Sequence, residues 1–154
     1  MDEIALQDRY GAADICFGCG PQNPRGLRIK SRVAGDEIVA DWAPGPGLEA
    51  FPGILNGGIV ATLLDCHSWW TAAHHLMLAG ALDQPPSIVT ADLSVAYQRP
   101  TPSDRPVHLS ARITETTDRR TTVDAVLTSD GVTTATATST FIAIRPGHPA
   151  YGTR

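Results

Sequence analysis

Long apolar runs and an excess of basic residues are both missing from this sequence of 154 residues. The longest apolar stretch, Ile59–Leu64, includes a threonine and is far shorter than the ~20 residues that a membrane-spanning helix needs. The acidic N-terminus lacks the basic start and apolar core of a signal peptide, so we expect a cytoplasmic protein without a membrane partner. The net charge of −4 argues against nucleic acid as a partner.

Cysteine is also scarce, with Cys16, Cys19 and Cys66 as the only three. An odd number of cysteines without an export signal predicts reduced thiols. Cys16 and Cys19 have the spacing of a metal or redox pair, but a zinc ribbon needs a second such pair. The Gly20-Pro21 that follows cannot begin the helix of a thioredoxin-like site. The sequence therefore predicts neither a metal nor a cofactor.

What the sequence does contain is enough apolar material for one packed domain. Apolar residues make up 42% of the chain and charged residues 18%, values typical of a globular protein. We expect a single domain over residues 1–154. Glycine and proline are dense near its start, which predicts an irregular segment over 1–26, and residues 146–154 are expected to form a loose tail.

The hydropathy pattern predicts one long helix within a chain that is otherwise strand-like. Residues 56–80 have no internal proline and have apolar residues on most faces, as in a buried helix. Asn56 is a good N-cap and Gly80 a plausible stop. Residues 48–55 are expected to be a loop. Alternating apolar and polar residues predict six strands, over 27–33, 37–43, 88–98, 107–113, 121–129 and 132–144.

One helix against one antiparallel sheet of five to six strands is an α+β fold. Such a sheet can wrap around the helix, but its edges and its far face remain bare. Exposed edges of this kind favour association with another copy of the chain. We therefore expect a homo-oligomer, with a dimer as the minimal unit and a tetramer as the fuller assembly.

The start of the predicted helix is the first candidate for chemistry. Gly57 and Gly58 disfavour a helix by up to ~1 kcal/mol each relative to alanine, but they let another molecule approach the backbone closely. The first N–H groups of a helix lack internal partners and carry partial positive charge, so they can stabilise an oxyanion. The alternative is a tight turn packed against the sheet, and the residues alone favour neither.

Asp65 is the second candidate. It lies about two turns into a helix predicted to be buried, and aspartate is rarely buried without a partner. Its spacing from Gly57 and Gly58 places it near the same helix face, ~11–12 Å further along the axis. A carboxylate and a backbone donor on one cleft suit hydrolysis of an activated acyl group. The alternative is a structural aspartate bonded to Ser68 or to a neighbouring strand.

Three segments together resemble the hotdog-fold thioesterases of the PaaI-like type. They are CFGCGPQNPRGLRI (16–29), FPGILNGGIVATLLD (51–65) and TADLSVAYQRP (90–100). The resemblance covers roughly residues 16–145. It implies a long central helix wrapped by an antiparallel sheet, and hydrolysis of acyl-CoA thioesters at sites shared between two subunits.

The resemblance also implies roles for individual residues. The Gly57 N–H is matched to the donor that binds the thioester carbonyl, and Asp65 to the general base or nucleophile. Thr90 is matched to the hydroxyl that places the water or the carboxylate. Asn56 stands where the family commonly has histidine, so it can cap the helix but cannot act as an imidazole.

Three further residues are expected at the substrate. Gly58 adjoins the proposed donor, and Arg99 is a candidate partner for the phosphates of CoA, as is the basic cluster over residues 25–32. Trp69 either shapes the acyl pocket or packs in the core.

Two other functions remain open at this point. One is an acyl-CoA-binding protein without catalysis, which Asn56 allows. The other is a hotdog-fold enoyl-CoA hydratase or dehydratase. Those enzymes use a histidine and acid pair, and Asn56 together with the spacing of His67 argues against it.

Overall fold

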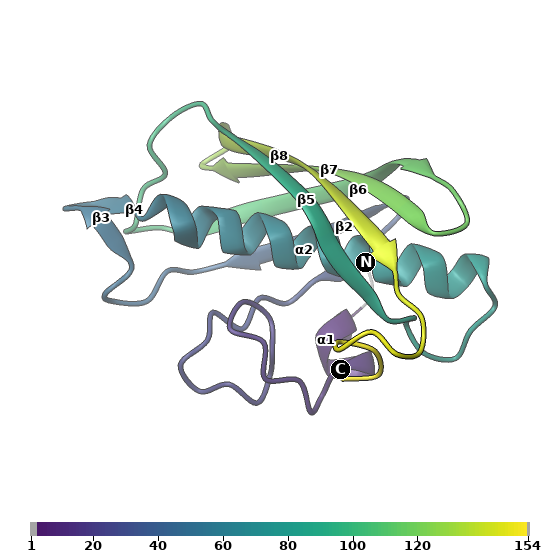
Figure 1. The fold of residues 1–154 in the computed structure, drawn as a ribbon. Helices are drawn as coiled ribbons and strands as arrows, with labels where there is room; N and C mark the ends of the chain where they lie inside the picture. The colour runs from purple at the N-terminus through teal and green to yellow at the C-terminus, as the bar shows by residue number, and fades with distance from the viewer. Residues whose placement is uncertain (1–2, 154) are drawn as a thin grey trace.

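The computed structural model describes residues 3–153 and consists of one long helix, a short helix and two antiparallel sheets (Figure 1). In chain order the elements are α1 (Leu6–Tyr10), β1 (Arg32–Ala34), β2 (Glu37–Trp42), β3 (Glu49–Phe51), β4 (Ile54–Leu55), α2 (Gly57–Ala79), β5 (Ile88–Tyr97), β6 (Val107–Thr116), β7 (Arg120–Ser129) and β8 (Val132–Ala143). Within residues 3–153, neither helix has both the length and the apolar composition needed to cross a bilayer.

The main sheet has six strands in the order β1-β2-β6-β7-β8-β5, and every neighbouring pair is antiparallel. The strand that follows α2 in sequence, β5, therefore forms one edge of the sheet and β1 forms the other. The α+β architecture and the expected strand number are confirmed. The separate β3–β4 hairpin occupies the segment 48–55, which we expected to be a loop, because Gly53 turns the chain back with φ of 82°.

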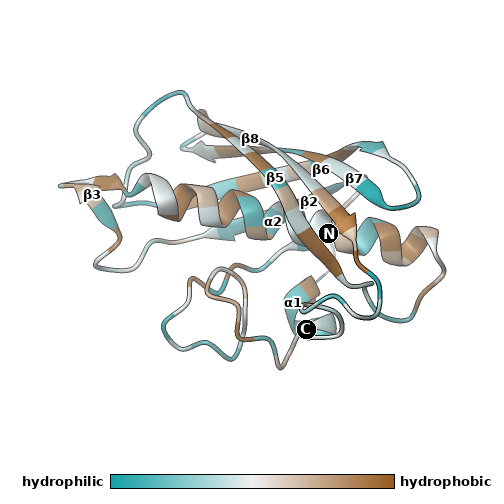
Figure 2. Cartoon of the chain, in the orientation of Figure 1, coloured by the Kyte–Doolittle hydropathy of each residue, from teal (hydrophilic) through white to brown (hydrophobic). Residues whose placement is uncertain are grey.

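The helix α2 is apolar nearly all round because it is covered from two sides. It lies between the sheet and the N-terminal segment (Figure 1), and apolar bands recur along its length (Figure 2). One buried cluster joins Leu63 and Leu64 of α2 to Val123 of β7, and also to Leu6 and Ile29 on the other side. The predicted helix over 56–80 is confirmed, with Asn56 as N-cap and Gly80 as C-cap.

The segment 27–33 differs from its prediction as a strand, because only its last two residues belong to β1. The Leu27 and Ile29 N–H groups donate to Phe17 O and Gly18 O, at 2.8 and 3.1 Å. Between them Arg28 has φ of 53°, which interrupts the extended conformation. The alternation of apolar residues here reflects burial beneath α2 rather than pairing with β2.

The described parts of the two terminal segments contain more local structure than the sequence suggested. The segment 1–26 contains α1, whose Leu6 N–H donates to Ser31 O at 2.8 Å. The tail was expected to be loose over 146–154, but its described residues 146–153 form turns, and the Gly152 N–H donates to Ser87 Oγ at 3.0 Å. Residues 1, 2 and 154 lie outside the described part of the chain.

A buried polar network joins four of these segments. The His67 ring on α2 bonds Ser31 Oγ at 2.8 Å and Ile38 O at 2.9 Å, and the Gln7 side-chain amide donates to Ser31 Oγ at 3.1 Å. Burial lowers the pKa of His67 to about 4, so the ring is neutral at neutral pH. A neutral ring donates through Nε2 to Ile38 O and accepts the Ser31 hydroxyl at Nδ1. The histidine is therefore a structural group.

Replacing His67 by alanine is expected to lower the free energy of unfolding by roughly 3 kcal/mol, since it opens a cavity and removes two buried hydrogen bonds. Urea unfolding followed by circular dichroism measures the loss. His75→Ala, at a half-buried position on the same helix, is the matched control and should cost much less. Equal losses in the two variants would show that the network contributes little.

Candidate functional site

Asp65 and Thr90, two residues singled out from the sequence, are in direct contact. The Thr90 hydroxyl donates to Asp65 Oδ1 at 3.0 Å. Asp65 is half-buried on α2, whereas Thr90 is exposed near the start of β5. The contact fixes the carboxylate on the side of the helix over which β5 passes.

This carboxylate lines a cavity of about 410 Å³. We name it the acid cavity; its wall includes Asp65, Thr90, Cys16, Cys66, Trp69 and Trp70, and it extends to Tyr10 and to Thr153 of the tail. The two tryptophans meet edge to face, with ring centroids 5.1 Å apart. A carboxylate beside aromatic walls suits a ligand with an apolar portion and one polar reacting group.

Trp69 belongs to both the core and the cavity wall. Its side chain is only 9% exposed, and its indole N–H donates to Ile88 O at 3.1 Å. The ring therefore offers a ligand an apolar surface, and its N–H already has an acceptor.

The start of α2 lines a second cavity of about 420 Å³, here called the amide cavity. Asn56 caps the helix by accepting the Gly58 N–H on Oδ1 at 2.8 Å, so the Gly58 amide, expected to bind substrate, is already occupied. Within residues 3–153 the Gly57 N–H donates no hydrogen bond. The Gly57 N–H is therefore the backbone donor at the start of α2 that is available to a bound ligand.

Tyr97, which the sequence did not single out, holds this helix start in place. Its hydroxyl donates to Gly57 O at 2.7 Å from the end of β5. Arg99 follows two residues later and lines the same amide cavity. Arg99, a predicted phosphate partner, therefore shares the amide cavity with Gly57.

The two predicted catalytic groups do not share one cavity within a single chain. Gly57 lines the amide cavity and Asp65 the acid cavity. Eight residues of helix separate them by ~12 Å along the axis. The expectation of one shared cleft therefore does not hold inside one protomer.

A β-bulge explains how β5 reaches both groups. In the pairing of β5 with β8, Thr90 lies opposite Phe141 and Asp92 opposite Thr140, so Ala91 is an extra residue. An extra residue reverses which face the following side chains occupy. Thr90 and Tyr97 have opposite parity in the sequence, and the bulge lets both point toward α2.

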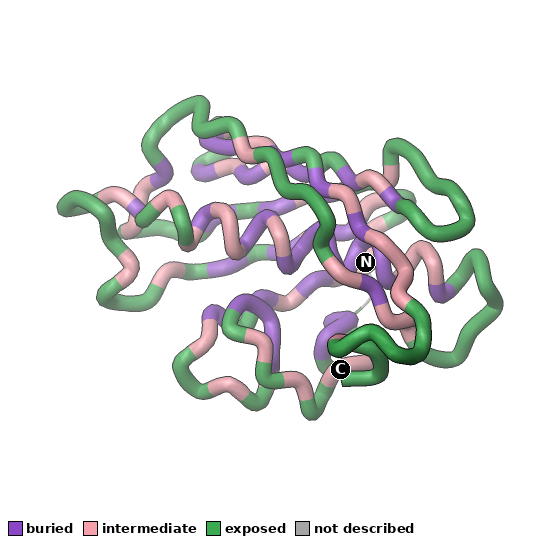
Figure 3. Tube along the Cα trace, viewed as in Figure 1, coloured by how far each residue is buried: buried purple, intermediate pink, exposed green. Residues whose placement is uncertain are grey.

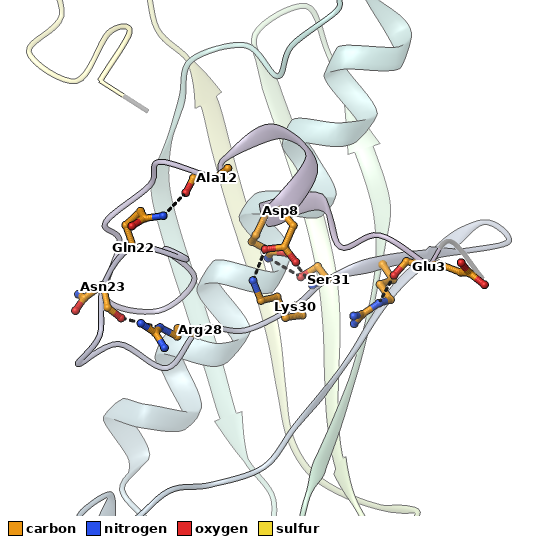
Figure 4. Close-up of polar contacts among 10 residues, drawn as sticks. Glu3, Asp8, Ala12, Gln22, Asn23, Arg28, Lys30 and Ser31 are labelled. Carbon is orange, nitrogen blue, oxygen red and sulfur yellow. Dashed lines mark hydrogen bonds and ion pairs between the residues drawn. The ribbon is translucent and has the colours of Figure 1, made fainter.

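Side chains of the basic cluster over residues 25–32 contact the N-terminal segment and do not line a cavity (Figure 4). Arg28 Nε donates to Asn23 O at 3.0 Å, and Lys30 forms an ion pair with Asp8. Arg32 Nε donates to Glu3 O at 3.3 Å. None of these basic side chains lines the acid cavity or the amide cavity.

The cysteines are closer together than the sequence spacing suggested. Cys16 Sγ lies 3.7 Å from Cys66 Sγ, and Cys19 is fully buried beside them. Hydrogen bonds from the Cys19 and Cys66 thiols hold the pKa of Cys16 far below its usual value. The same contacts and burial raise the pKa of Cys66. Of these two thiols, Cys16 thus carries the negative charge more readily than Cys66.

Comparisons with known proteins agree on the family. The model of the thioesterase superfamily matches residues 52–136. The acyl-coenzyme A thioesterase THEM4 of Xenopus laevis is 30% identical over 111 residues, which cover 71% of this chain and 46% of that protein. The chain therefore spans about half the length of this curated relative.

Two solved structures show the same architecture. Protein BH2602 of Bacillus halodurans, determined with CoA, is 26% identical, with a TM-score of 0.59 over 77% of this chain and 76% of that one. The E. coli PaaI protein from the phenylacetic acid degradation operon is 13% identical, with a TM-score of 0.65 over 77% of this chain and 81% of that one, a likeness of fold alone. The helix α2 against its six-stranded sheet is the hotdog fold, and the chain belongs to the thioesterase superfamily.

Proposed function

We propose that the protein hydrolyses acyl-CoA thioesters, releasing the free acid and CoA. Family membership and the CoA found in the Bacillus halodurans relative support the substrate class. The observation that carries the proposal is the half-buried Asp65 carboxylate, held by Thr90 at the wall of a partly aromatic cavity. A carboxylate in this setting can act on a water molecule or on the acyl carbon itself.

The complete site needs a second copy of the chain. Among the described residues, β5 pairs with β8 on one side only, and most of β5 is exposed (Figure 3). Its exposed residues include Leu93 and Tyr97. Pairing of β5 with its own copy, antiparallel about a two-fold axis near Leu93, would extend the sheet across a dimer. A free strand edge with exposed apolar residues favours this association.

Such pairing brings the two half-sites together. Thr90 lies near the start of β5 and contacts Asp65, whereas Tyr97 lies at its end and contacts Gly57. In an antiparallel pair, the Thr90 end of one strand lies beside the Tyr97 end of the other. Gly57 then faces Asp65 of the partner subunit, and the dimer contains two equivalent sites. The tetramer stays a prediction.

The chemistry follows from these positions. The thioester oxygen accepts the Gly57 N–H at the positive end of α2, where the charge of a tetrahedral intermediate is stabilised. Asp65 of the partner subunit either removes a proton from the attacking water or attacks the carbonyl to form a transient anhydride that water then cleaves. The C–S bond breaks, and the CoA thiolate leaves and takes a proton from solvent. Arg99 lines the amide cavity, and its guanidinium is our candidate partner for the CoA phosphates.

Loss of thioester absorbance over a panel of acyl-CoAs of different acyl groups tests this proposal without interference from the protein's own thiols. We expect turnover of at least one acyl class, with one free thiol released for each thioester lost. Tight binding of acyl-CoA without thiol release would instead indicate a binding protein. Hydration of an enoyl-CoA without thiol release would indicate a hydratase. The absence of both binding and turnover for every acyl-CoA of the panel would contradict the proposal.

A further inference from the structure

Three cysteine sulfurs from two distant parts of the chain meet at the wall of the acid cavity. The Sγ atoms of Cys16, Cys19 and Cys66 all lie within 4.8 Å of one another, and none of the three forms a disulfide. Cys16 and Cys19 come from the N-terminal loop, whereas Cys66 comes from α2. Cys66 is only 7% exposed and Cys19 is fully buried. The cluster is therefore part of the folded interior and joins the loop to the helix.

The spacing of the sulfurs suits a shared metal ion. The distance of 3.7 Å between Cys16 Sγ and Cys66 Sγ is far beyond the ~2.0 Å of a disulfide bond. Two thiolates bound to a tetrahedral zinc ion, each at ~2.3 Å, stand about 3.8 Å apart. The observed separation matches the edge of such a tetrahedron.

The surroundings keep the sulfurs close and supply an outer hydrogen bond. A side chain at Gly18 would collide with Cys66 Sγ, and one at Gly20 would collide with the Cys16 nitrogen. The Trp70 indole N–H donates to Cys19 Sγ at 3.3 Å. Donors of this kind orient ligand atoms in metal sites and stabilise their negative charge.

We propose that Cys16, Cys19 and Cys66 bind one thiophilic d¹⁰ cation, for which Zn²⁺ is the probe. Each coordinating thiol gives up its proton to solvent and forms one metal–sulfur bond. Cys16 and Cys66 both line the acid cavity, so a water molecule entering from the cavity completes a four-coordinate site. The ion would fix the N-terminal loop to α2. This inference goes beyond the proposed hydrolase activity and does not depend on it.

Zinc titration of the full chain tests the site. Protein stripped with a chelator and kept in a non-thiol reductant is titrated with Zn²⁺ against a chromophoric chelator, and Co²⁺ is added separately. We expect one zinc per chain, and a cobalt spectrum with thiolate charge-transfer bands of a tetrahedral site. Cys16→Ser, at a half-exposed position, should weaken zinc binding at least ~100-fold, since outer-shell changes alone typically cost 10–100-fold.

The control for surface binding is His108→Gln. His108 is exposed and bonds Asp41 at 2.8 Å, so this pair offers an imidazole and a carboxylate on the surface to which added zinc could bind. Its replacement should leave zinc affinity unchanged. The proposal is overturned if folded wild-type protein with three reduced thiols takes up no zinc, if Cys16→Ser binds as tightly as the wild type, or if His108→Gln abolishes binding. A Cys16–Cys66 disulfide in the reductant-treated protein would equally overturn it. None of these readouts measures hydrolysis, so they stand apart from the test of the proposed function.

Discussion

Replacing Asp65 by asparagine is expected to lower kcat by about 10²–10⁴-fold, the usual contribution of a general base. Asparagine keeps the shape of the side chain and can still accept the Thr90 hydroxyl that donates to Asp65 Oδ1. The acid cavity should therefore stay intact, and KM should change little. Steady-state rates on the best acyl-CoA of the panel, with unfolding curves beside them, measure the effect.

Asp83→Asn is the matched control, since Asp83 is exposed after the end of α2 and lines neither cavity. It should keep full activity. Full activity in Asp65→Asn would exclude the proposed chemistry. A single turnover in heavy-oxygen water separates the two routes for Asp65. Direct attack by water labels only the released acid, whereas hydrolysis of an anhydride at the aspartyl carbon labels the protein.

The second large effect is expected at Gly57, where proline removes the amide hydrogen and little else. Proline is favoured at the first position of a helix, and Asn56, with φ of −61° and ψ of 136°, already has the conformation that precedes proline. We expect Gly57→Pro to lower kcat by about 10²–10³-fold, as when one oxyanion donor is lost. Activity on the acyl-CoA panel and thermal unfolding measure it.

Gly57→Ala is the control, because it keeps the amide and its added Cβ would lie 3.4 Å from the Tyr97 hydroxyl, an ordinary contact. It should retain most of the activity. If alanine and proline reduce the rate equally, the amide is not the donor and the effect is steric.

Mixing the two inactive variants tests the shared site. If Gly57 acts with Asp65 of the partner subunit, a heterodimer of Gly57→Pro and Asp65→Asn contains one intact site. Random exchange of subunits should then restore about a quarter of the wild-type rate. A site formed within one chain gives no recovery, and a monomer in sedimentation analysis would exclude the shared arrangement directly.

The helix and the sheet could be predicted because their signals are local. α2 has its N-cap, its stop and an uninterrupted apolar composition in one stretch of sequence, and β7 alternates in burial as its residues do. The segment 27–31 was wrongly predicted as part of a strand, and the reason is physical. It is buried under α2 by contacts with the N-terminal loop, and burial without strand pairing gives the same alternation of residues.

The site was harder to predict, since its groups are joined by long-range contacts. Asp65 could be singled out as a carboxylate on a buried helix, and Gly57 as a bare amide at its start. Nothing local indicates that Tyr97 bonds Gly57 O, 40 positions away. Cys66 joins Cys16 from 50 positions away, so a search for a second nearby cysteine pair could not find the cluster.

The bulge at Ala91 also sets a limit on what substitution experiments can reveal about this protein. Thr90 reaches Asp65, and Tyr97 reaches Gly57, because the strand contains one residue more than its partner between those points. An alanine scan does not test this position, because residue 91 is already alanine. Most other side chains would fit there, since Ala91 is exposed. Losing that single peptide unit would turn Thr90 away while the rest of the strand kept its pairing. Among homologous chains, a one-residue gap here would therefore matter more to the chemistry than most exchanges of one amino acid for another.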